Sequence, residues 1–329
     1  MTAFPLRYAA TLATTAFLVM LALSCKGNDS DEPAVVPTLA SSPQAPTVPR
    51  PSPTPTRSPT PRPQPTQPRA VATPPSTLSY SFGPGVDVGD RAVIGNAIEV
   101  SRRILASYGA GEPPCTVLAF DTLTGLSQAY ARAAGSQGWR AADVVRRLLN
   151  GVAEAGYRTV SIYTNSSFWR DADAVERSQA VSHEFIHVVQ LEMVGEKLAV
   201  ATFDTPADRT PPGGPFWLLE GSAELLSWHV IEELRLGNLR SKLDEYAAAA
   251  AAGHVALRDM ETYVGYVGTG RLGVATSVRG VEALLANRPV SDLFRFWRLV
   301  GAGQTWQNAF VLVFGMPVTD FYRTFESTR

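Results

Sequence analysis

His183-Glu184-Phe185-Ile186-His187 is an H-E-x-x-H segment inside a stretch of helical periodicity that begins near Ala174 and runs to about Val194. Residues four apart lie on one face of a helix, so both imidazole rings can reach a single metal ion. Glu184 stands beside the first histidine and can contact an attacking water without itself taking a ligand position. The segment therefore predicts a helix with two zinc ligands and a catalytic carboxylate. Histidines that only pack within a buried helix are the alternative.

Around this helix the periodicity of the apolar residues changes. Before it, helical and strand patterns alternate, whereas from Phe216 onward nearly every periodic segment has helical spacing. The expected helices are Asp90–Tyr108, Leu123–Ala134, Ala141–Gly151, Phe216–Arg235, Gly273–Ala286, Leu293–Val300 and Trp306–Phe314, with an alanine run at Ala247–Ala252; the expected strands are Cys115–Phe120 and Thr159–Thr164, followed by a loop at Asn165–Asp173. This order predicts an α+β fold: a small mixed β-sheet lobe over residues 78–194, which includes the active-site helix, and a mainly helical C-terminal lobe over residues 195–329.

The N-terminus has the pattern of an export signal. Arg7 precedes an apolar stretch of about 16 residues, Tyr8–Leu23, which is short for a membrane span and has the proportions of a secretory signal. The segment Leu21-Ala22-Leu23-Ser24-Cys25 resembles a bacterial lipobox, whose cysteine is acylated and becomes the first mature residue. We therefore expect a lipoprotein signal over residues 1–24 and a lipid anchor at Cys25. An ordinary signal peptide, or one membrane helix, with an incidental cysteine is the alternative.

Residues 25–77 have the composition of a tether. Fifteen of the 25 prolines lie between Pro33 and Pro75, and no Asp or Glu occurs between Glu32 and Asp87. Such a Pro/Thr/Ser-rich segment favours extended polyproline II and cannot bury enough apolar surface to fold. We expect a disordered spacer that connects the lipid anchor to a folded domain over residues 78–329. A docking motif within the spacer is the alternative.

The folded region has a small negative charge. Residues 78–329 contain 23 lysines and arginines against 27 aspartates and glutamates. A protein that relies on phosphate contacts normally shows a basic excess, so nucleic acid is not an expected partner. Cys115 is the only cysteine besides Cys25, which excludes a disulfide framework and predicts a buried thiol.

The pairing of HEFIHVVQ (183–190) with WLLEGSAEL (217–225) resembles the gluzincin metallopeptidases, the superfamily of thermolysin and the zinc aminopeptidases, and within it the bacterial peptidase-MA-like family. The end of the chain is similar to the same family at Gly303-Gln304-Thr305-Trp306, Ala309-Phe310, Phe314-Gly315, Asp320-Phe321-Tyr322 and Phe325-Glu326. The resemblance covers residues 150–329 and is specific at the two motifs. It implies a zincin-like fold.

Carried over residue by residue, the resemblance implies that His183, His187 and Glu220 hold one catalytic Zn²⁺ and leave the fourth position to water. Glu184 is then the general base that takes a proton from the water and delivers it to the leaving amine. A surface acid is the alternative for Glu220. Glu224, one turn further along, is either an acceptor for the free N–H of a zinc histidine or a solvated helix charge.

The resemblance also implies an oxyanion donor, for which gluzincins commonly use a tyrosine or histidine of the helical lobe. Tyr266 is favoured because it precedes a small-residue stretch, Gly268–Gly273, where the family tends to place a tyrosine. A tyrosine that is packed or at the surface is the alternative. The other candidates are Tyr263, His229, which we expect to be structural, and His254, which we expect at the surface.

Two segments near the motifs are expected to shape a substrate cleft. The resemblance places Thr159–Thr164 at the upper rim, where it pairs with an extended substrate backbone and Asn165 and Ser166 add polar contacts. A plain edge strand is the alternative. The Pro/Gly-rich insert Thr205–Pro215 makes the spacing between the two motifs longer than thermolysin's, and it is either a flap or a simple loop.

Together, the motifs and the resemblance predict an exported, lipid-anchored zinc metallopeptidase on the extracytoplasmic face of a bacterial membrane or at the cell surface. Its partner would be a peptide or protein substrate, cleaved at internal bonds by metal-activated water. Zinc aminopeptidases capture the substrate amine with a G-x-M-E-N segment, and residues 78–182 contain none. The alternatives are a noncatalytic cell-surface binding module that retains the zincin fold and a zinc hydrolase for another class of substrate.

Overall fold

The computed structural model describes residues 78–134 and 153–328. The expected signal peptide, the lipid anchor at Cys25, the tether and the helix expected at Ala141–Gly151 lie outside the described residues and stay predictions. Among the described helices, none combines the length and the apolar character that crossing a membrane requires.

The first half of the described chain contains a small mixed β-sheet. Its strands are β1 (Leu78–Phe82), β2 (Cys115–Phe120), β3 (Ala153–Gly156) and β4 (Thr159–Tyr163), in the order β1-β2-β4-β3. The strands β1, β2 and β4 are parallel, and β3 pairs antiparallel with β4. The expected strands β2 and β4 are confirmed. The sequence did not reveal β1, which is short and partly exposed, or β3, whose Ala-Glu-Ala-Gly sequence has little strand propensity.

The expectation that the strand at 159–164 forms the rim of a cleft is wrong. β4 has β2 on one side and β3 on the other, so its backbone is already paired along both edges. Among the described residues, β3 is the strand at that edge of the sheet. The turn Tyr157-Arg158 joins the two strands, and Arg158 donates two hydrogen bonds, of 2.8 and 2.7 Å, to the Glu192 carboxylate on helix α6. The hairpin is thereby tied to that helix.

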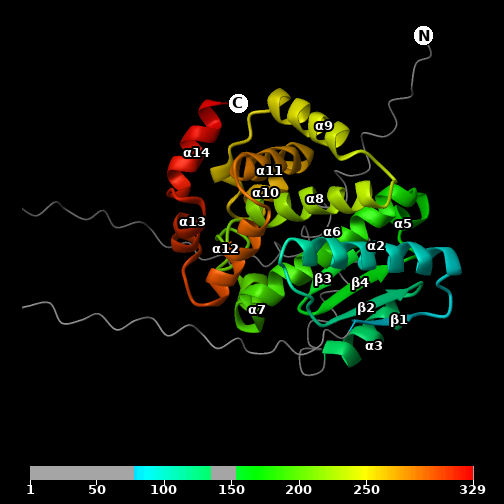
Figure 1. Ribbon diagram of the computed structural model, residues 1–329. Helices are drawn as coiled ribbons and strands as arrows, with labels where there is room; N and C mark the ends of the chain where they lie inside the picture. The colour runs from blue at the N-terminus through cyan, green and yellow to red at the C-terminus, as the bar shows by residue number, and fades with distance from the viewer. Residues whose placement is uncertain (1–77, 135–152, 329) are drawn as a thin grey trace, which may run out of the picture. The chain divides into compact units, whose positions relative to one another are not determined.

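Helices cover both faces of the sheet (Figure 1). The helices of this half are α2 (Val88–Ser107), α3 (Leu123–Ala134), α5 (Ser167–Asp171) and α6 (Ala174–Val194). Strand alternation assigns the faces: Val117 and Ala119 belong to the core shared with α2 and α6, whereas Leu118 and Phe120 pack with α3. The short helix α5 occupies residues where the sequence predicted a loop. Cys115 is buried, as expected, and burial raises the pKa of its thiol to about 12.

The second half of the described chain is helical, as expected, and contains no strand among residues 195–328. Its elements are α7 (Glu196–Asp204), α8 (Phe216–Glu233), α9 (Leu239–Ala252), the 3-10 helix η3 (Leu257–Met260), α10 (Tyr263–Gly268), α11 (Gly270–Leu285), α12 (Ser291–Gly301), α13 (Trp306–Phe314) and α14 (Val318–Ser327). The sequence did not predict α7 or α14. The α+β class, with a small mixed sheet and a mainly helical second half, is confirmed.

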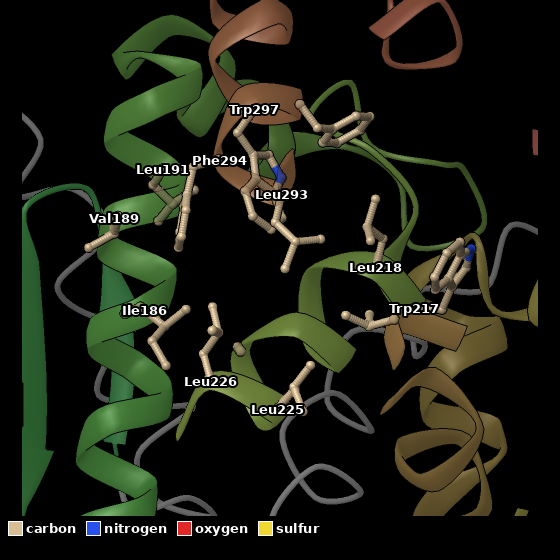
Figure 2. Packing of buried hydrophobic residues seen from close by; sticks show 14 of the residues in the cluster. Ile186, Val189, Leu191, Trp217, Leu218, Leu225, Leu226, Leu293, Phe294 and Trp297 are labelled. Carbon is tan, nitrogen blue, oxygen red and sulfur yellow. The ribbon is translucent and has the colours of Figure 1, made fainter. Parts of the chain in front are cut away.

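One continuous core joins the two halves. Figure 2 shows Ile186 of α6, Leu218 and Leu226 of α8, and Leu293 and Phe294 of α12 converging in the space between their helices. At the start of α8, the ring of Trp217 is fully buried, and its Nε1 donates to the hydroxyl of Tyr322 on α14 at 2.9 Å. Helix α8 is therefore held between α6 and the C-terminal helices.

Helices α8 and α11 approach closely at Gly221. A Cβ atom added there would lie 2.6 Å from the carbonyl carbon and oxygen of Ser277, which is backbone that cannot rotate away. Only a residue without a side chain fits this contact, and the contact fixes α8 at the turn that carries Glu220.

We expect Gly221→Ala to lower the free energy of unfolding by about 1–3 kcal/mol, because the two helices must separate. Helix propensity acts in the opposite direction, by about 0.5–1 kcal/mol. Gly95→Ala in α2 is the matched control, since its added Cβ meets nothing within 4 Å and should be neutral or stabilising. Urea denaturation of both variants measures the difference. Stabilisation of both by the same amount would contradict the close approach.

Candidate metal centre

Helix α6 holds the H-E-x-x-H segment in its buried central part. Asp173 accepts a hydrogen bond from the backbone N–H of Glu176, whose side chain accepts one from the Asp173 N–H, so a capping box fixes the start of the helix. Gly195, with φ of 81°, ends it. The bounds Ala174–Val194 agree with the sequence prediction. A helix fixed at both ends and buried between them gives its side chains defined positions.

His183 and His187 present their Nε2 atoms to the same point. These two atoms lie 3.0 Å apart, and the rings meet edge to face with centroids separated by 4.7 Å. This is the arrangement that a spacing of four residues predicts on one helix face.

Helix α8 brings Glu220 to the two histidines. Its Oε2 lies 3.4 Å from His183 Nε2, and its Oε1 lies 3.6 Å from His187 Nε2. The three side chains each offer one ligand atom, all within 4.8 Å of one another, so they can hold one metal ion. Burial alone would raise the pKa of the Glu220 carboxyl, but the adjacent His187 and His183 lower it well below its usual value. Burial would likewise lower the pKa of the His183 and His187 imidazoles, but the Glu220 carboxylate raises it, so positive charge is favoured where the three groups meet.

Glu184 lies next to this triad without joining it. Its Oε2 accepts a hydrogen bond from the backbone N–H of Ala155 on the edge strand β3 at 2.8 Å. Burial raises the pKa of the Glu184 carboxyl to about 7, against the lowering effect of His187 and His183. A carboxyl with a pKa near neutrality is suited to both accept and release a proton.

Glu224 is not a solvated helix charge. It is buried, with 8% exposure, and lies 3.2 Å from the Nδ1 of His183. Its carboxylate also accepts hydrogen bonds from Gln179, Trp228 and Tyr246. Since a carboxylate only accepts, the His183 Nδ1 carries the proton in this contact, and the Nε2 lone pair is left for a metal ion.

Gln190 plays the corresponding part for His187, and sequence reasoning missed it. Its amide nitrogen donates to Leu219 O at 3.2 Å and to Ser222 Oγ at 3.0 Å, both on α8. The amide oxygen, 2.7 Å from His187 Nδ1, is thereby assigned as the acceptor of the Nδ1 proton. The signal available in the sequence was a polar residue one turn after His187 on the buried side of the helix.

The triad opens into a cavity of about 180 Å³. Its lining comes from β3, α6, α7, the insert between α7 and α8, and the starts of α8 and α10: Glu154, Ala155, His183, Glu184, His187, Leu191, Thr202, Thr205, Pro206, Ala207, Arg209, Phe216, Leu219, Glu220 and Tyr263. The insert Thr205–Pro215 is therefore part of the cavity wall. It is tied to α10 by a hydrogen bond of 2.9 Å from Val264 N to Ala207 O.

Of the candidate oxyanion donors, Tyr263 lines this cavity and Tyr266 does not. Tyr266 is buried, and its ring stacks on Phe216. Burial, followed by the charges of Glu220 and Glu224, raises the pKa of its hydroxyl, so Tyr266 lies within electrostatic reach of the triad. Tyr263 is thus the candidate that lies at the cavity wall, and the role expected of Tyr266 stays a prediction.

The remaining candidates do not line the cavity. His229 is partly buried with its Nδ1 3.4 Å from the hydroxyl of Tyr108, which fits a structural role, and His254 is exposed. Ser166, expected to contact substrate, does not line the cavity, and its hydroxyl accepts from Trp169 N at 3.1 Å and caps α5. Asn165 is exposed beside it.

In comparisons with known proteins, no family model, no curated protein and no solved structure matches the chain.

Proposed function

We propose that this protein is a zinc-dependent peptidase of gluzincin type that hydrolyses internal peptide bonds. One observation carries the proposal: three side chains, His183, His187 and Glu220, converge on one point, while a fourth, Glu184, lines the same cavity outside the ligand set. Two imidazoles and one carboxylate are a donor set that suits zinc. Three protein donors leave a coordination position open, as catalytic zinc requires, whereas structural sites are closed by a fourth protein ligand.

Zinc, when bound there, would lower the pKa of a water molecule and polarise the substrate carbonyl. Glu184 would accept a proton from the attacking water and pass it to the leaving nitrogen. The oxygen of the water forms the new bond to the carbonyl carbon, and the C–N bond breaks. The products are a carboxylate and a free amine, so the reaction consumes one water for each bond cleaved.

Two further side chains position the ligands. Glu224 and Gln190 each hold the Nδ1 proton of one histidine and so direct the Nε2 lone pairs toward the metal. The contacts of Gln190 with Leu219 and Ser222 also fix α6 against α8, the two helices that supply the ligands. The site is therefore braced between two helices rather than built on loops.

A peptide suits this cavity better than other substrates of zinc hydrolases, because one wall is β3, the strand at this edge of the sheet among the described residues. An extended peptide can pair with a free strand edge through its main chain. The Ala155 N–H, which donates to Glu184 in this structure, is one of the groups on this strand that a peptide carbonyl would compete for. The zincin-like fold is part of the proposal: it is supported by a mixed sheet, an active-site helix beneath its edge and a helical second half. The exported location and the lipid anchor stay predictions from the sequence.

The test is zinc-dependent cleavage of a peptide library. The purified protein is stripped with a chelator, reloaded with one equivalent of zinc and incubated with mixed peptides whose two ends are blocked. We expect new internal termini by mass spectrometry in the reloaded sample and none in the stripped sample. A protein that binds zinc and peptides but leaves every peptide intact would instead be the noncatalytic binding module.

A further inference from the structure

Arg209 is an exposed cationic side chain at the wall of the cavity, with no acidic partner among the described residues. It lines the same cavity as Glu184 and Glu220. Within residues 78–134 and 153–328, its guanidinium makes no hydrogen bond or ion pair. Arg158, on the neighbouring β3–β4 turn, is by contrast fully engaged by the Glu192 carboxylate. The five N–H donors of Arg209 are therefore available to a molecule in the cavity.

The backbone that carries Arg209 is held on both sides. Two residues before it, the carbonyl of Ala207 accepts a hydrogen bond of 2.9 Å from Val264 N. One residue after it, the hydroxyl of Thr210 donates to Glu261 at 3.3 Å. The Arg209 N–H itself closes a turn by donating to Pro206 O at 2.9 Å. The arginine thus projects from a fixed point of the insert, which reduces the entropy lost when it binds a ligand.

The charges around the cavity show which ligand Arg209 suits. The lining also contains two histidines, Tyr263 and the three acidic residues Glu154, Glu184 and Glu220, of which Glu220 faces the histidines. Among the described lining residues, Arg209 is the only lysine or arginine. A guanidinium matches the planar geometry of a carboxylate and binds it with two parallel hydrogen bonds. Arg209 would offset the repulsion that Glu154 and Glu184 exert on such a group.

We propose that Arg209 selects substrates with a carboxylate close to the bond that is cleaved. This inference rests on the proposed peptidase function and specifies its substrate class as acidic peptides. The carboxylate can come from an Asp or Glu side chain or from the free C-terminus of a short peptide. The first source makes the enzyme an endopeptidase for acidic sequences, and the second makes it remove residues from C-terminal ends.

The test uses matched peptides that contain Glu or Gln at each position around the cleaved bond, each with a free or an amidated C-terminus. For the wild type we expect kcat/KM to be about three- to thirtyfold higher for the carboxylate at one position, with a smaller ratio at high salt. Arg209→Ala should bring the ratio of kcat/KM for Glu and Gln peptides close to one. Arg209→Glu should instead favour peptides that carry Lys at that position over those that carry Glu. Arg295→Ala, which removes an exposed arginine outside the cavity, should leave the ratio unchanged.

A binding measurement separates failure of this inference from failure of the proposed function. The Glu and Gln peptides are titrated into the Glu184→Gln protein, with and without Arg209→Ala, and Kd is measured by fluorescence anisotropy. The inference is overturned if cleavage and binding do not depend on the carboxylate, or if the preference for it remains in Arg209→Ala. Neither outcome contradicts the proposed peptidase function. If no peptide is cleaved, the peptidase fails, and an Arg209-dependent difference in Kd still supports carboxylate selection. A preference for Glu over Gln that persists in the amidated peptides identifies the side chain as the source, and an effect that requires a free C-terminus identifies the terminus.

Discussion

Glu184→Gln is expected to reduce kcat by about 10²–10⁴-fold while the protein keeps its zinc. The substitution removes a carboxylate that lines the cavity beside the two histidine ligands and is not itself one of the three ligands. Glutamine has the same shape, and its amide oxygen can still accept the hydrogen bond from Ala155 N. The change therefore isolates proton transfer from folding and from metal binding.

The measurement combines steady-state kinetics on the best library peptide with zinc content by elemental mass spectrometry. Glu245→Gln is the control, since it neutralises an exposed glutamate on α9 that pairs with Lys242 and lies outside the cavity. It should behave as the wild type in both measurements. Cleavage by Glu184→Gln at the wild-type rate would show that Glu184 is not the base. A binding module would show the same peptide affinity with either residue and no turnover with either.

Local sequence determined the part of the site that lies on one helix. The period of the apolar residues gave the bounds of α6, and the spacing of four placed His183 and His187 on one face. Both are properties of a few consecutive turns, which is why they could be predicted without knowing the rest of the fold. The position of Glu220 could not be obtained in this way. It depends on how α8 packs against α6, and only the resemblance of its motif indicated it.

The features that sequence reasoning missed are tertiary. The place of β4 within the sheet follows from strand order, which periodicity does not contain, and the resemblance places at the rim a strand that is interior here. Among the described residues the strand at that edge is β3, which is four residues of Ala, Glu and Gly that pair because β4 and α6 position them. Gln190 acquires its role only when Leu219 and Ser222 of another helix satisfy its amide. In each case a neighbour distant in the sequence decides what the residue does.

Glu220→Ala is expected to remove the metal from a protein that stays folded. Two histidines 3.0 Å apart at their Nε2 atoms would remain, with no carboxylate to complete the set or to balance the charge of the ion. Loss of a hydrogen-bonding partner behind a metal ligand typically lowers affinity by about 10–100-fold, and loss of a ligand itself should exceed this. Glu224→Gln is the matched comparison, because it changes a glutamate one turn away on the same helix that touches His183 from behind.

The three proteins are compared by competition for zinc with a fluorescent chelator, and circular dichroism verifies that each is folded. Zinc should bind the wild type at one ion per chain, Glu224→Gln at an affinity about 10–100-fold lower, and Glu220→Ala more weakly still. This order follows from the geometry, because Glu220 faces the convergence of the two Nε2 atoms and Glu224 faces only the Nδ1 of one ring. Equal affinity in the wild type and Glu220→Ala would place the ion elsewhere. A folded wild type that cannot be loaded at all would remove the basis of the peptidase proposal, since Glu184 would then have no activated water from which to take a proton.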